Sequence, residues 1–61
     1  MARRITKKLL AVTKENVKEI LIIWGHNEEE AARKVEEGFD LAVKAMPSDD
    51  AKGVANYVAY F

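Results

Sequence analysis

The segment between Asn27 and Pro47 constrains the fold most, because it carries a start signal and a stop signal for one long helix. Asn27 and Glu30 have capping-box spacing, and glutamates fill the first turn, where the helix dipole favours negative charge. Pro47 disfavours helical backbone at the residue before it. We therefore predict a helix over residues 28–45, with a break at Gly38 as the alternative. Its apolar residues recur at steps of three and four, the period of one helical face: Ala32, Val35, Phe39, Ala42 and Met46.

A shorter helix is expected before this long one. Thr13 is a suitable amino-terminal cap, and Gly25 stands where a left-handed residue commonly ends a helix, which gives a helix over residues 14–24. The run Ile20–Trp24 contains no polar residue and would also suit a strand by its composition. The alternative is therefore a hairpin in which residues 17–24 pair with residues 5–12 around a turn at residues 14–16.

A third helix is expected after the proline. Ser48, followed by two aspartates, is a suitable cap for a helix over residues 49–60. We expect this helix to fold back on the long one, with Tyr57 and Tyr60 beside its apolar stripe. The stripe has the spacing of a helix face that packs on a core: Ala51, Val54, Ala55, Val58 and Phe61.

The amino-terminal segment is basic, although the whole chain has no net charge. The first acidic residue is Glu15, after four basic residues in the first eight positions. Such a segment is typical of one that contacts phosphates, and a solubilising terminus is the other interpretation. From Arg4 to Leu10 the mixture of β-branched and basic residues suits a short strand, and a helix entering at Thr6 is the alternative. The four basic residues are Arg3, Arg4, Lys7 and Lys8.

The length of the chain indicates an oligomer. A chain of 61 residues buries only about 60% of its unfolded surface, and chains of this size usually need disulfides, a metal or a partner subunit. No cysteine is present and there is one histidine, which leaves a partner subunit. The expected fold is therefore mainly α: a short strand or extended basic arm over residues 1–12, a helical core over residues 13–46 and a carboxyl-terminal helix over residues 48–61, in one small domain that forms a homodimer.

The residues available for chemistry predict neither an enzyme nor a bound cofactor. His26 follows a turn glycine, Ser48 is used as a cap, and the isolated glycines form no phosphate-binding loop. The longest apolar run is far shorter than the roughly 20 residues of a membrane-spanning helix. Because the chain also lacks cysteine, we expect a cytoplasmic protein with no membrane partner.

The order of elements from Arg3 to about Met46 resembles the ribbon-helix-helix DNA-binding proteins. A basic strand, a short helix, a glycine turn at Gly25 and a capped second helix from Asn27 carry the resemblance. It implies a dimeric transcriptional regulator whose paired amino-terminal strands enter the major groove of DNA. It would also place Val35 and Phe39 in the dimer core. The residues expected on DNA are Arg3, Arg4, Thr6, Lys7 and Lys8.

A second resemblance is to the ubiquitin-associated three-helix domains. Val17, Leu21, the turn Trp24–His26, Ala31 and Val35 have similar spacings, with Trp and His in place of the family's Met and Phe. This resemblance implies a partner protein bound by the turn and the last helix. The alternative function is therefore a small helical interaction or inhibitor module that uses the tryptophan and the carboxyl-terminal aromatic residues. Residues expected at a partner or dimer interface are Trp24, Val35, Phe39, Ala42, Met46, Tyr57 and Phe61.

Overall fold

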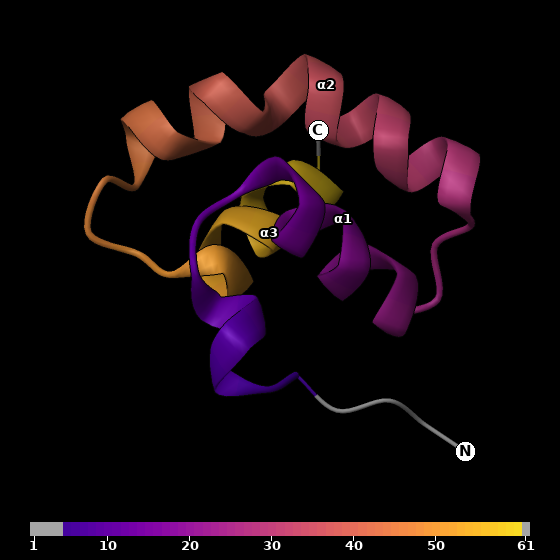
Figure 1. Ribbon diagram of the computed structural model, residues 1–61. Helices are drawn as coiled ribbons and strands as arrows, with labels where there is room; N and C mark the ends of the chain where they lie inside the picture. Colours follow the sequence, from indigo (N-terminus) through magenta and orange to yellow (C-terminus); the bar gives the residue numbers. More distant parts are fainter. Residues whose placement is uncertain (1–4, 61) are drawn as a thin grey trace.

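A computed structural model describes residues 5–60 and shows three α-helices preceded by a single 3-10 turn (Figure 1). This part of the chain contains no β-strand. The prediction of a mainly helical fold with three helices is thus confirmed, although the first helix ends one residue earlier and the third begins two residues later than expected. In chain order the elements are η1 (Lys7–Leu10), α1 (Lys14–Ile23), α2 (Glu28–Ala45) and α3 (Ala51–Ala59).

Helix α2 begins after the predicted cap, Asn27, and ends before the predicted stop, Pro47. The side chain of Asn27 accepts a hydrogen bond from the Glu30 amide over 2.7 Å, which satisfies one of the free N–H groups of the first turn. At the other end the helix stops at Ala45, before Pro47. It runs without interruption through Gly38, which is buried, so the alternative with a break there is wrong.

Helix α1 also follows its signals, and the hairpin alternative is wrong. The hydroxyl of Thr13 accepts a hydrogen bond from the Asn16 amide over 3.1 Å. At the carboxyl end Gly25 has a φ of 106°, and the His26 amide donates back to the Leu21 carbonyl over 3.0 Å, which closes a Schellman turn. The helical period puts three apolar residues on one buried stripe, whereas a strand would divide them between two faces: Val17, Ile20 and Leu21.

Helix α3 is capped by Asp50 rather than by Ser48. The Asp50 carboxylate accepts a hydrogen bond from the Gly53 amide over 3.2 Å. Asp49 lies just outside the helix and packs against Gly53 so closely that a Cβ added to the glycine would be 2.8 Å from the Asp49 Cβ. The aspartates expected in the first turn therefore precede the helix, which begins at Ala51.

The three helices enclose one core. Helix α2 arches over α1 and α3, and each helix contacts both of the others (Figure 1). Helix α3 folds back on α2, as expected. Because all three helices supply buried side chains, the predicted helical core of residues 13–46 closes only when α3 is added. The buried apolar residues are Val17, Ile20, Leu21, Ala31, Val35, Ala42, Ala51, Val54, Ala55 and Val58.

The strand predicted for the amino-terminal segment is absent from residues 5–10, and the 3-10 turn η1 begins directly after Thr6, where the alternative placed the start of a helix. The side-chain amide of Asn16, on α1, donates one hydrogen bond to the Lys8 carbonyl over 3.0 Å and one to the Ala11 carbonyl over 2.9 Å. These two bonds hold the backbone of the turn against α1, a contact that an extended strand would not make. Two apolar side chains of the segment also pack against the core: Ile5 and Leu9.

Candidate functional site

A few large apolar side chains remain exposed, and they mark the candidate binding surfaces. Trp24, Tyr57 and Tyr60 are 40%, 37% and 87% exposed. A single exposed apolar side chain is ordinary on a protein surface, but aromatic side chains that share a hollow are typical of a binding site. The two tyrosines do share one, and it is the first candidate.

Tyr57 and Tyr60 line a groove of about 420 Å³ together with Met46 and Asn56. Met46 is the carboxyl-terminal cap residue of α2, and the other three residues belong to α3 or to its cap. The groove therefore opens where the end of α2 meets the outer face of α3. None of the four side chains carries a charge. We call this feature the tyrosine groove.

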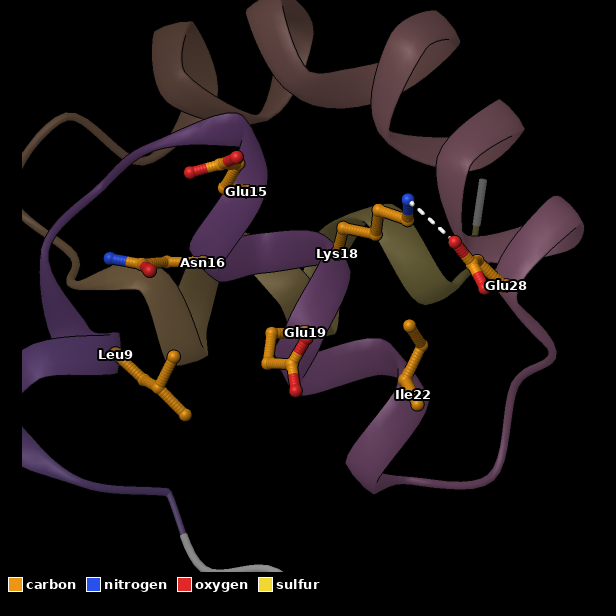
Figure 2. Close-up of a pocket in the computed structure, with 7 residues that line it drawn as sticks. All are labelled: Leu9, Glu15, Asn16, Lys18, Glu19, Ile22 and Glu28. Atoms are coloured by element: carbon orange, nitrogen blue, oxygen red, sulfur yellow. Dashed lines mark ion pairs between the residues drawn. The ribbon is translucent and has the colours of Figure 1, made fainter.

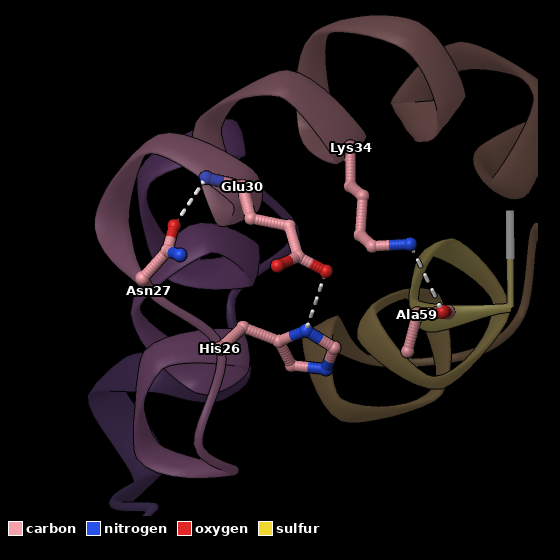
Figure 3. Close-up of polar contacts among 5 residues, drawn as sticks. All are labelled: His26, Asn27, Glu30, Lys34 and Ala59. Atoms are coloured by element: carbon pink, nitrogen blue, oxygen red, sulfur yellow. Dashed lines mark hydrogen bonds and ion pairs between the residues drawn. The ribbon is translucent and has the colours of Figure 1, made fainter.

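The end of α3 that carries Tyr60 is fixed to α2. The ammonium group of Lys34 donates a hydrogen bond to the Ala59 carbonyl over 3.4 Å, in a partly buried contact (Figure 3). A positive charge at this position is favourable, because the free carbonyls at the end of a helix are partly negative. The Tyr60 amide donates to the Tyr57 carbonyl over 3.2 Å, so a tight final turn joins the two tyrosines. The backbone beneath the tyrosine groove is thus held in place.

Trp24 belongs to a different surface. It is the carboxyl-terminal cap of α1 and does not line the tyrosine groove. In the same turn, the Nδ1 of His26 lies 3.6 Å from the Oε1 of Glu30, in the first turn of α2 (Figure 3). Glu30 and Lys34 are one helical turn apart, so the turn and the end of α3 both contact the same stretch of α2.

The residues predicted to bind nucleic acid fall into two groups. Thr6, Lys7 and Lys8 are exposed on the anchored turn or just before it. Arg3 and Arg4 lie outside the described residues. The structure thus places the first group together on one short segment of the surface.

A second groove, of about 580 Å³, lies between η1, α1 and the start of α2 (Figure 2). It carries three carboxylates and one lysine, and that lysine, Lys18, lies 3.5 Å from the carboxylate of Glu28. The excess of negative charge disfavours a phosphate group on this side of the turn. The residues that line it are Leu9, Glu15, Asn16, Lys18, Glu19, Ile22 and Glu28.

The residues predicted at a dimer interface lie at different depths. Val35 and Ala42 are inside the core of the chain itself, because α1 and α3 already cover that face of α2. Phe39 is half-buried against the same core. Met46 is half-buried in the tyrosine groove, and Phe61 lies outside the described residues. Of the predicted set, Met46 and Tyr57 are therefore the two residues that the structure brings together on the surface.

The sequence predicted a partner surface of carboxyl-terminal aromatic residues, but it did not single out Tyr60 as an interface residue, and Asn56 was not predicted at all. Tyr60 follows Tyr57 by three residues, which puts both side chains on neighbouring positions of one helix face. Asn56 is next to Tyr57 and is likewise exposed. The signal that could have found them is the stripe opposite the buried residues Val54 and Val58 of α3.

Residues 5–60 contain neither a cluster of metal-binding side chains nor a membrane-spanning helix. No group of three or more histidine, cysteine, aspartate or glutamate side chains lies close enough together there to hold a metal ion. No helix in the same range has both the length and the apolar composition that crossing a bilayer requires.

Comparison with known proteins places the chain in a family. A family model described as "Family of unknown function (DUF7421)" matches residues 1–61. No curated protein matches the chain, and no solved structure does. The match covers the whole sequence, and the chain therefore belongs to the DUF7421 family.

Proposed function

We propose that this protein is a small helical interaction module that binds a partner protein at the tyrosine groove. The observation that carries the proposal is the exposure of Tyr60, 87%, beside Tyr57 in a groove without charged side chains. Tyrosine is enriched among the residues that dominate binding energy, because it offers a large rigid apolar surface and a polar tip.

The test is selection of peptides from a displayed random library on the immobilised protein, followed by calorimetric titration. We expect the selected peptides to bind Tyr60→Ala at least tenfold more weakly than the unchanged protein, about 1.4 kcal/mol. Leu41→Ala is the matched control, because Leu41 is 50% exposed on α2 and does not line the groove. Equal loss in both variants, or no loss in Tyr60→Ala, would contradict the proposal.

A second candidate function is DNA binding by a dimeric transcriptional regulator. The observation that favours it is the anchoring of η1 through Asn16, which presents Lys7 and Lys8 from a fixed turn rather than from a loose end. Arg3 and Arg4 extend the same basic segment, and a dimer would double its charge.

This second candidate is tested by the fluorescence anisotropy of a labelled mixed-sequence duplex. With four phosphate contacts per chain, the affinity should fall about a hundredfold between about 50 and 200 mM salt. Lys7→Ala combined with Lys8→Ala should weaken binding, whereas Lys44→Ala, which removes an exposed lysine at the carboxyl-terminal end of α2, should not. Light scattering on the same samples reports whether the protein is a dimer. Absence of binding at the lower salt concentration would exclude this function.

A further inference from the structure

We propose that the occupant of the tyrosine groove is a proline-rich peptide segment in the polyproline II conformation. This inference rests on the proposed function and names the class of partner. It follows from the exposed area of the groove, from its lack of charge and from the donors along its wall.

The exposed area is too small for a second copy of the chain. A whole aromatic side chain presents about 150–250 Å², so the exposed fractions of Tyr57 and Tyr60, 37% and 87%, together offer roughly 200–300 Å². A stable dimer needs about 800 Å² from each partner. The tyrosine groove is therefore of the size that receives a short segment of chain.

The lining excludes most other ways of binding a peptide. An acidic or phosphorylated peptide needs a cluster of arginines, and none of the four lining residues is charged. Strand addition needs the edge of a sheet, and residues 5–60 contain no strand. An amphipathic helix needs anchoring positions over about two turns, roughly 10 Å, whereas the two tyrosines are only three residues apart.

A polyproline II segment needs what this lining offers. It has no internal hydrogen bonds, so its carbonyl groups accept bonds from the wall of a groove, and its rings pack on aromatic side chains. The two tyrosine rings supply the aromatic surface, and Met46 supplies an adaptable apolar contact. The tyrosine hydroxyls and the Asn56 amide are hydrogen-bond donors for the carbonyls. Because the segment is already extended when free, it also loses little entropy on binding.

The test is titration of the ¹⁵N-labelled full-length protein with a decaproline peptide, followed by amide chemical shifts. We expect saturable shifts centred on residues 46, 56, 57 and 60. A glycine–serine peptide of equal length should cause none. Tyr60→Ala should weaken the binding of decaproline at least tenfold, and Leu41→Ala should leave it unchanged. The spectrum of each free variant reports whether it is folded, which is expected at such exposed positions.

The outcomes separate this inference from the proposed function. If decaproline causes no saturable shifts, or if Tyr60→Ala binds it as well as the unchanged protein does, the proline inference is wrong. If library-selected peptides without proline still depend on Tyr60, the proposed function stands without the inference. If neither decaproline nor any selected peptide depends on Tyr60, both are wrong.

Discussion

The ammonium group of Lys34 lies 3.4 Å from the carbonyl oxygen of Ala59, and it joins the first half of α2 to the last turn of α3. The contact is partly buried and lies one residue before Tyr60. It therefore does two things at once: it neutralises the negative end of α3 and sets the direction in which that helix presents its tyrosines.

Replacing Lys34 by Met keeps the aliphatic stem and removes the donor. We expect a loss of about 1 kcal/mol in the free energy of unfolding, measured by urea titration. The affinity for a ligand of the tyrosine groove should fall as well. Lys52→Met is the control, because Lys52 is exposed near the start of α3, far along the helix from the Ala59 carbonyl. Equal stability of the two variants would show that the Lys34 contact contributes nothing.

Replacing Gly25 by Ala tests the turn between α1 and α2. A Cβ at this position would meet no atom within 4 Å, so the expected cost comes only from the φ of 106°. We expect a loss of about 1–2 kcal/mol. In a domain of this size that lowers the melting temperature by about 4–8 °C for each kcal/mol. Gly25→Asn should lose less, because asparagine tolerates positive φ better. If Gly25→Asn were less stable than Gly25→Ala, the loss of stability would come from side-chain contacts and not from the positive φ.

Gly53→Ala should destabilise the protein, although alanine is normally the better helix former by about 1 kcal/mol. The reason is the Asp49 side chain, whose Cβ would be 2.8 Å from the new Cβ. Overpacking of this kind costs about 1–3 kcal/mol. The double variant Asp49→Ala with Gly53→Ala keeps the Cβ at residue 49, so it should relieve only the part of the clash that the carboxylate causes. Denaturant unfolding of the unchanged protein, of the single variants Gly53→Ala and Asp49→Ala and of the double variant gives the coupling. A Gly53→Ala variant as stable as the unchanged protein would disprove the clash.

Asn16→Ala and Asn16→Asp test how η1 is held. Alanine removes two donated hydrogen bonds, to the Lys8 and Ala11 carbonyls, and should cost about 1–2 kcal/mol. Aspartate should cost more, because its oxygens would face those carbonyls without a donor. Hydrogen exchange at the Leu9 amide, which donates to Thr6, reports the opening of the turn directly. Asn56→Ala, on the surface of α3, should leave that exchange rate unchanged.

The helices could be predicted from the sequence where local signals and burial agree. Asn27 and Pro47 bound α2 in the sequence and in the structure. The local sequence could not exclude a strand in place of α1, because its apolar run suits both structures. The helix is favoured by the packing of Val17 in the core that α1 shares with α2 and α3. Likewise, the state of residues 7–10 depends on Asn16, a contact that no local pattern reveals.

The sequence predicted the type of candidate site, an aromatic surface, but not all of the residues that form it. An aromatic surface near the carboxyl end was expected, and Tyr57 and Met46 belong to it. Val35 and Ala42 were expected at an interface between chains, but the same apolar stripe packs inside one chain. An apolar stripe indicates that another element covers that face of the helix, but it does not show whether this element belongs to the same chain or to a partner. Which tyrosine protrudes depends on how α3 crosses α2, and that angle is a property of the whole domain.

The tyrosine groove lies on the outer face of a helix whose inner face fills the core with Ala51, Val54, Ala55 and Val58. The site therefore exists only while the entire domain is folded. By thermodynamic linkage, a ligand at a hundred times its dissociation constant stabilises the native state by about 2.7 kcal/mol. At about 4–8 °C for each kcal/mol, the melting curve shifts by roughly ten degrees or more. Heating the protein in the presence of one compound after another thus reports which of them occupies the groove.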